Sequence, residues 1–179
     1  MTGGAAFLFK FPRPLWTEKA GLKERSRERG RNTESVPHFS LQRFALVNQK
    51  ANSAHTYVCC ERGTGTVAGF YSLAVGIEPS TAAGRVVKGL ARHPVPVMIL
   101  ARLAIDQKHQ GAGLGRALLK DALLRTVQAA DIAGIRALLV HAKDDAARDW
   151  YLHWGFESSP TDPYHLFLLI KDLLKIVKL

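Results

Sequence analysis

The order of apolar and polar positions along the chain predicts alternating strands and helices. Short runs rich in branched and aromatic residues, flanked by turn residues, predict strands. These are His55–Cys60, Thr66–Val75, Met98–Ile105, Ile135–His141 and Tyr164–Ile170. Apolar residues three and four positions apart predict helices. These cover Leu41–Asn48, residues 114–130 and Asp144–His153.

The turn Arg62–Gly65 joins the first two strands into a hairpin, whereas Pro94 and Pro96 are expected to keep Ala91–Val97 irregular. The order is then hairpin, strand, helix, strand, helix, strand. It predicts an α/β (α+β) fold, in which a mixed central sheet carries helices on both faces.

The stretch Met98–Ala130 organises the chain. A buried strand leads into the glycine-rich turn Gln110–Arg116, and a helix with a broad apolar face follows. Glycines allow successive backbone N–H groups to point into one concavity, and the helix start adds unpaired donors and a positive dipole end. This arrangement predicts a binding site for a pyrophosphate.

Two common phosphate motifs do not fit this turn. The pattern G-x-G-x-x-G fails in both registers, and no Gly-Lys-Ser/Thr follows as in a P-loop. What fits is Gln/Arg-x-x-Gly-x-Gly/Ala, met by Gln110, Gly113 and Gly115. This resembles the acetyl-CoA pyrophosphate loop of the GNAT acetyltransferases. The resemblance implies that acetyl-CoA is the co-substrate and that its phosphates contact Gln110, Gly111, Ala112, Gly113, Leu114, Gly115 and Arg116.

The resemblance extends over roughly residues 40–172 and is most specific over 98–160. It includes Leu100–Asp106, Leu124–Ile135, Ala137–Ala142, Trp150-Tyr151 and Gly155–Glu157. It is closest to the GNAT toxins of type II toxin–antitoxin pairs. Members of that branch acetylate the α-amino group of the amino acid on charged tRNA, which blocks translation. Their antitoxin is usually a small ribbon-helix-helix protein, and they often form homodimers.

The same resemblance implies roles for residues on either side of the glycine turn. Two neighbouring strands splay apart in this fold, so the backbone of Leu103, Ala104 and Ile105 is expected to pair with the pantetheine amides. Tyr151 matches the tyrosine that acts as general acid toward the departing thiolate; the alternative is a packed aromatic ring. No carboxylate stands out as a base, but an α-amino group with a pKa of about 7.7–8.0 is partly neutral near pH 7.

The formal net charge of +10 favours an acidic partner such as nucleic acid. Arg85, Lys88 and Arg92 form a basic cluster that we interpret as an RNA-binding candidate, the alternative being a solvated basic face. The histidines and cysteines show no metal-ligand spacing, so no metal is expected.

Residues 1–37 do not match the opening of the family and are dominated by charge after Lys19. We expect a poorly packed or disordered segment here and the acetyltransferase domain over 38–179. No apolar run is long enough for a membrane span, and no signal peptide is evident. Cys59 and Cys60 are adjacent, so we expect no bridge between them and a cytoplasmic protein.

Three functions remain open from the sequence. The first is a toxin that acetylates aminoacyl-tRNA. The second keeps the fold but acetylates a small amine or a protein N-terminus. The third is an inactive remnant that binds only CoA or an antitoxin, which the unmatched N-terminal segment would favour.

Overall fold

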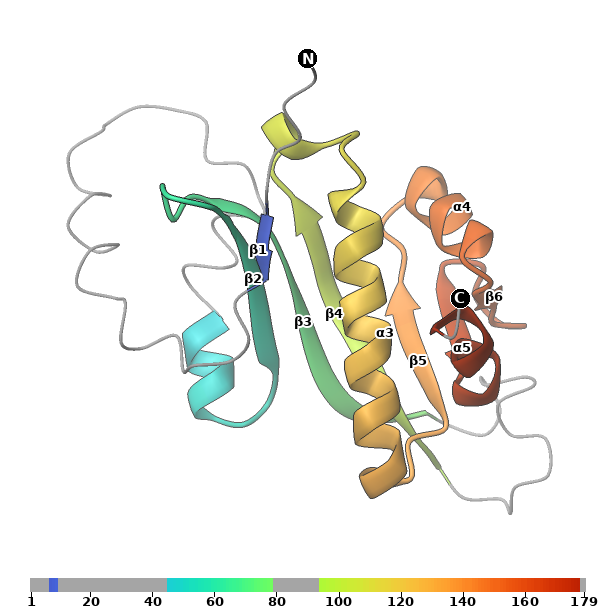
Figure 1. Ribbon diagram of the computed structural model, residues 1–179. Helices are drawn as coiled ribbons and strands as arrows, with labels where there is room; N and C mark the ends of the chain where they lie inside the picture. Colours follow the sequence, from blue (N-terminus) through green and yellow to red (C-terminus); the bar gives the residue numbers. More distant parts are fainter. Residues whose placement is uncertain (1–6, 10–44, 79–93, 178–179) are drawn as a thin grey trace.

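A seven-stranded sheet forms the centre of the computed structural model, which describes residues 7–9, 45–78 and 94–177 (Figure 1). Its order is β1-β2-β3-β4-β5-β7-β6. The strands are β1 Phe7–Phe9, β2 His55–Glu61, β3 Val67–Glu78, β4 Val95–Ile105, β5 Ala137–His141, β6 Glu157–Ser158 and β7 His165–Leu169. The β4–β5 pair is parallel and every other neighbouring pair is antiparallel, so the predicted mixed sheet is confirmed.

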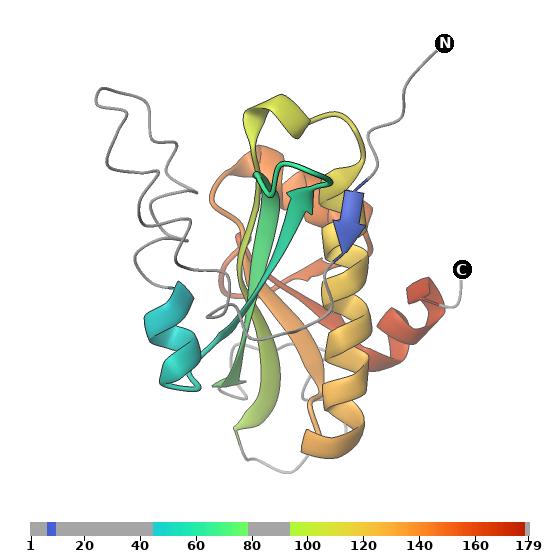
Figure 2. The ribbon, with the colours of Figure 1, turned by 60° about the vertical axis from the view of Figure 1, so that its left-hand side comes forward.

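The helices are α3 Leu114–Ala133, α4 Asp145–His153 and α5 Ile170–Val177, with the short 3-10 helix η3 Gln107–His109 and a helical turn at residues 45–50. Figure 2 shows α3 and α5 on one side of the sheet and the helical residues 45–50 on the other. Among the described residues, none of the helices is both long and apolar enough to cross a membrane.

Buried side chains form two clusters, one on each face of the sheet. The larger lies beneath α3 and α5 and includes Leu118, Leu123, Leu138, Tyr151 and Leu173. The smaller, on the opposite face, consists of strand residues alone: Val95, Val97, Ala137, Leu139, Phe167 and Leu169. Since side chains alternate along a strand, β4, β5 and β7 contribute to both clusters. Apart from His141 and His165 at their ends, β5 and β7 are apolar on both faces, which follows from this two-sided burial.

A polar network fixes α3 against β3 within the larger cluster. The Tyr71 hydroxyl donates to the Asp121 carboxylate and accepts from Arg125 Nε at 2.8 Å. Arg125 also pairs with Asp121 at 3.0 Å, and its guanidinium lies 4.1 Å from the centre of the Tyr57 ring. Burial and the neighbouring carboxylate raise the pKa of Tyr71 well above its usual range, so this hydroxyl stays protonated. These contacts set the position of the helix that starts at the glycine turn.

The structure differs from the sequence prediction at Pro96. We predicted Ala91–Val97 to be irregular, but β4 begins at Val95 and includes Pro96. The Pro96 carbonyl accepts a hydrogen bond of 2.9 Å from the Arg136 N–H, which places that side of Pro96 toward β5. The first β4–β5 pair is Val97 with Ala137, so the missing N–H falls just before the pairing starts.

Other differences lie at the ends of the fold. Phe7–Phe9, within the segment expected to be poorly packed, forms β1 and pairs with β2 over Glu61–Cys59. The rest of residues 1–37 lies outside the described residues. The sequence also did not predict β6 or α5, and β3 continues past Val75 to Glu78.

We predict that Tyr71→Phe destabilises the protein by about 1–3 kcal/mol, because Asp121 and Arg125 lose a buried hydrogen-bond partner. Tyr57→Phe is the matched control: it keeps the ring that stacks on Tyr71 at 5.0 Å and should change stability by no more than about 0.5 kcal/mol. Urea unfolding of both variants measures the difference. Equal losses in the two variants would contradict a role for the Tyr71 hydroxyl.

Candidate functional site

The C-terminal half of β4 has an open edge. Its pairing with β5 covers only Val97–Ile99, while its pairing with β3 continues to Ile105. Ala101 is an extra residue in the β3–β4 ladder, because Leu100 pairs with Leu73 and Arg102 with Ser72. This bulge bends the strand at the point where β4 and β5 separate. Leu103, Ala104 and Ile105 are half-buried there and have no ladder partner on the β5 side within the described chain.

The segment after β4 is fastened to the β2–β3 hairpin. Asp106 caps η3 by accepting the Lys108 N–H at 3.0 Å, and its own N–H donates to the Ala68 carbonyl at 2.9 Å. His109 Nε2 lies 2.7 Å from Glu61 Oε1. Hydrogen bonds from His109 and Thr64 lower the pKa of Glu61, so this carboxylate stays charged. These contacts to the β2–β3 hairpin therefore hold the start of the glycine turn in place.

The glycine turn adopts a backbone that favours glycine. Gly111 has a φ of 77° and Gly113, the N-cap of α3, has a φ of 78°. Apart from chain neighbours, no atom of the described residues lies within 4 Å of a Cβ placed at either glycine, so the turn is open on this side. No side chain in the described part of the chain caps α3, and the first turn of α3 contains no acidic residue. Its first N–H groups are therefore available to an anion.

Residues Gln110–Arg116 are exposed or half-exposed except for Leu114, which is 3% exposed. The buried Leu114 side chain anchors the start of α3 in the core, while its backbone remains at the turn. The Gln110 side chain turns back and donates to the Ile105 carbonyl at 3.4 Å. The residues predicted on β4 and on the turn are therefore in contact.

α4 closes the other side of the turn. A Cβ placed at Gly115 would lie 3.8 Å from Ile105 Cγ1 and 3.8 Å from Trp150 Cζ2. The Arg116 guanidinium lies 5.2 Å from the centre of the Trp154 ring. Within the described chain, the buried Trp154 Nε1 has no acceptor. A positive charge and an unsatisfied N–H thus lie beside the helix start, which suits a ligand rich in phosphate.

Tyr151 comes from the last turn of α4 and is 7% exposed. Its ring packs edge-on against Trp150 and Phe156, with centres 5.0 and 5.3 Å away. Burial alone raises the pKa of Tyr151 to about 12. The hydroxyl is therefore a protonated donor throughout the neutral range.

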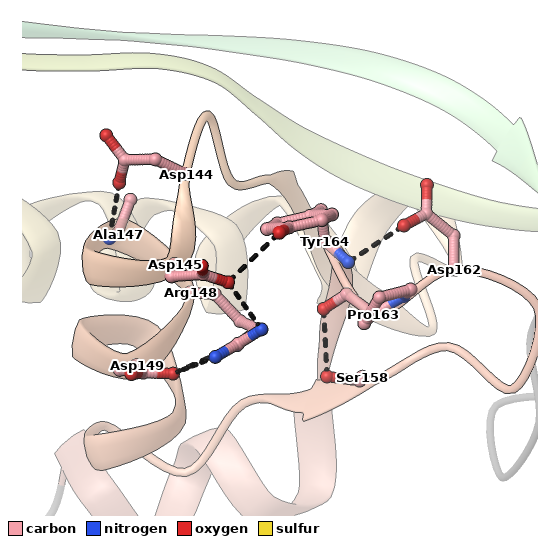
Figure 3. Close-up of polar contacts among 9 residues, drawn as sticks. All are labelled: Asp144, Asp145, Ala147, Arg148, Asp149, Ser158, Asp162, Pro163 and Tyr164. Carbon is pink, nitrogen blue, oxygen red and sulfur yellow. Dashed lines mark hydrogen bonds and ion pairs between the residues drawn. The ribbon is translucent and has the colours of Figure 1, made fainter.

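A polar cluster fixes the start of α4 against the loop before β7 (Figure 3). Asp144 caps the helix by accepting the Ala147 N–H at 2.8 Å. The Asp145 carboxylate accepts from the Tyr164 hydroxyl at 3.0 Å and from Arg148 at 2.7 Å. Hydrogen bonds within the loop, from Ser158 to the Pro163 carbonyl and from the Tyr164 N–H to Asp162, hold its shape. These contacts orient the helix that carries Tyr151.

The sequence did not reveal several of these features. The Trp154–Arg116 contact and the Asp145–Tyr164 hydrogen bond join residues far apart in the chain, and burial of Trp154 Nε1 without an acceptor among the described residues depends on tertiary packing. The predicted RNA-binding residues Arg85, Lys88 and Arg92 lie outside the described residues. Among the described residues no cluster of three or more potential metal ligands is present.

Comparison with known proteins gives consistent results. The model of the acetyltransferase (GNAT) domain matches residues 52–158. A tRNA-acetylating toxin of Mycobacterium tuberculosis (strain ATCC 25618 / H37Rv) is 49% identical over 138 residues, which cover 76% of this chain and 81% of the relative.

Two solved structures share the fold. AtaT complexed with acetyl-methionyl-tRNAfMet has a TM-score of 0.72 and 24% identity, covering 80% of this chain and 87% of that one. A mutant AtaT toxin bound to acetyl-CoA and the C-terminus of the antitoxin AtaR has a TM-score of 0.67 and 24% identity, covering 85% and 90%. Fold, domain match and relative agree: this chain belongs to the GNAT family of acetyltransferases.

Proposed function

We propose that this protein transfers the acetyl group of acetyl-CoA to the α-amino group of an amino acid carried by tRNA, and so acts as a toxin that inhibits translation. The observation that carries the proposal is the contact between the glycine turn and the open edge of β4, made by the hydrogen bond from the Gln110 side chain to the Ile105 carbonyl. Similarity to the M. tuberculosis relative, a tRNA-acetylating toxin, supports charged tRNA as the acceptor, and so does the net charge of +10. The reaction belongs in the cytoplasm, where charged tRNA is found.

We further propose a ribbon-helix-helix antitoxin and a homodimer as the protein partners. The AtaT complex with the antitoxin AtaR supports an antitoxin for this chain as well. Size-exclusion chromatography with light scattering tests the homodimer.

Backbone groups supply the main contacts to acetyl-CoA in this proposal. The N–H groups of Gly111–Arg116 meet the pyrophosphate, because the positive φ angles at Gly111 and Gly113 leave the turn open to an anion. Arg116 and the Trp154 N–H add charge and a donor at the same end. The backbone of Leu103–Ile105, unpaired on the β5 side, binds the pantetheine amides as an added strand would.

Tyr151 acts on the leaving thiolate. A thiol has an ordinary pKa of about 8.5, so complete transfer of a proton from a phenol with a pKa of about 12 is uphill by roughly 5 kcal/mol. A stable phenolate is therefore not formed. Tyr151 instead donates a hydrogen bond that strengthens as the C–S bond breaks, and full transfer follows as the acylated nitrogen loses its own proton.

We predict that Gly113→Asp abolishes acetyl-CoA binding, since a carboxylate at the N-cap lies where the pyrophosphate binds. Gly113→Asn is the matched control, because Asn has the same shape, no charge and the same tolerance for a left-handed backbone. Titration calorimetry should show that the Asp variant loses much more affinity than the Asn variant. Equal affinities of the two variants would remove the pyrophosphate from this position.

We predict that Tyr151→Phe lowers the single-turnover rate of acetylation by roughly 10²–10⁴-fold, the usual contribution of a positioned acid. Affinity for acetyl-CoA should stay nearly constant, because the hydroxyl acts mainly as the thiolate develops. The assay follows labelled acetyl from acetyl-CoA to total charged tRNA. Tyr57→Phe, which removes a hydroxyl from β2, serves as the control.

The results separate the competing interpretations. A packed-aromatic role for Tyr151 predicts equal rates in wild type and Tyr151→Phe. An inactive remnant predicts no acetylation by either protein. Acetylation of small amines or peptide N-termini in place of charged tRNA would retain the enzyme but replace the acceptor.

A further inference from the structure

A pair of stacked histidines lies where β5 separates from β4. The His141 and His165 rings are parallel within 9°, with centres 4.3 Å apart. His141 is the last residue of β5 and is exposed, whereas His165 is the first residue of β7 and is 9% exposed. His165 Nδ1 lies 3.8 Å from Glu78 Oε1, too far for a hydrogen bond but close enough for attraction. His165 Nε2 is buried and has no partner among the described residues.

The strand registers place this pair at the opening. The last β4–β5 pair joins Ile99 and Leu139, and His141 lies two residues beyond it. Leu139 belongs to the cluster on the face opposite α3, while Val140 belongs to the cluster beneath α3. By alternation, His141 shares the face of Leu139. His141 therefore lies at the opening between β4 and β5, on the face of the sheet opposite α3.

On the face beneath α3, the described residues Leu103, Ile105 and Tyr151 belong to or pack against the larger cluster. A thioester held along the open edge of β4 would then present its carbonyl carbon to the opposite face, and an amine would approach from there. Among the described residues, His141 is the exposed imidazole at that opening.

We propose that His141 is the proton acceptor for the α-ammonium group of the acceptor, with His165 as the positioning residue stacked behind it; this rests on the function proposed above. His141 takes one proton from the ammonium, and the resulting amine lone pair forms the C–N bond with the acetyl carbon. The C–S bond then breaks, the nitrogen loses a second proton, and the thiolate gains one through Tyr151. His141 releases its proton to solvent, so the step yields amide, thiol and one free proton.

The surroundings suit this role. Imidazole changes charge between pH 5 and 8, which matches the titration of an α-amino group. Burial lowers the pKa of His165, so this ring stays neutral behind a protonated His141 and does not repel it. The negative charges of Glu78 on β3 and Asp162 in the loop before β7 raise the pKa of His165, but burial has the larger effect. The exposed charged residues that follow His141 in the chain are Lys143 and Asp144, which pair with each other at 3.4 Å, and the exposed Arg102 pairs with Ser72 on β3.

The test is the pH dependence of single-turnover acetylation of charged tRNA between pH 5.5 and 8.5, with rapid quenching because the aminoacyl ester hydrolyses. His141→Gln should lower the rate by roughly 10²-fold or more near pH 6.5. The deficit should shrink above pH 8, because the amine is then already neutral. His55→Gln, an exposed histidine on β2, should match the wild type throughout.

Other outcomes overturn the assignment. A loss of rate that is independent of pH and appears in KM would make His141 a contact for RNA. Equal rates in His141→Gln and wild type would remove it from the reaction while leaving the proposed function intact. No acetylation by the wild type would instead remove the proposed function itself.

Two variants of His165 test the positioning residue. His165→Phe keeps a flat ring behind His141 and should retain most of the activity and its pH profile. His165→Ala removes the ring and should lower the rate most at low pH. If both variants bind acetyl-CoA normally and show the wild-type profile, His165 does not position His141.

Discussion

The early separation of β4 from β5 is the constraint on which the rest of the structure depends. The two strands pair over three residue positions and then diverge, so that within the described chain the backbone of Leu103–Ile105 has no neighbouring strand on the β5 side. The Ile105 carbonyl accepts from the Gln110 side chain, and any of the remaining half-buried peptide groups that has no partner is costly. A ligand with its own amides can satisfy them, so the opening provides both affinity and direction for an extended chain such as pantetheine.

Several packing contacts hold this opening in place. The bulge at Ala101 bends β4, and the absence of a Cβ at Gly115 lets Trp150 of α4 lie close to the start of α3. The Tyr71–Asp121–Arg125 network locks α3 to β3, so the helix start cannot shift along the sheet. The site is therefore a property of the core rather than of one loop, and its precision depends on contacts far from the reacting atoms.

The sequence predicted those parts of the fold that have a local signal. The glycines indicated a turn between the strand and the helix, where the structure has positive φ angles at Gly111 and Gly113, and the buried strands and long helices had clear periods. β1 was missed because a three-residue edge strand depends on pairing with β2. α5 was missed because it follows β7 without a glycine or proline between them. Pro96 was misread because only tertiary pairing shows which side of the strand lacks a donor.

The candidate site had signals of different kinds. The turn Gln110–Arg116 was identified by its short spacing and Tyr151 by resemblance to the family, and their roles stay predictions. The network under α3 joins residues fifty positions apart, and the stacked histidines come from two different strands. Such pairs have no periodic signature. In the mechanism proposed above, the proton transfers are divided across the sheet: the buried phenol of Tyr151, whose pKa is raised, serves the leaving group, and the exposed imidazole of His141 serves the incoming amine. In that mechanism the opening between β4 and β5 separates proton donor from proton acceptor, so that each can keep the charge state that its step requires.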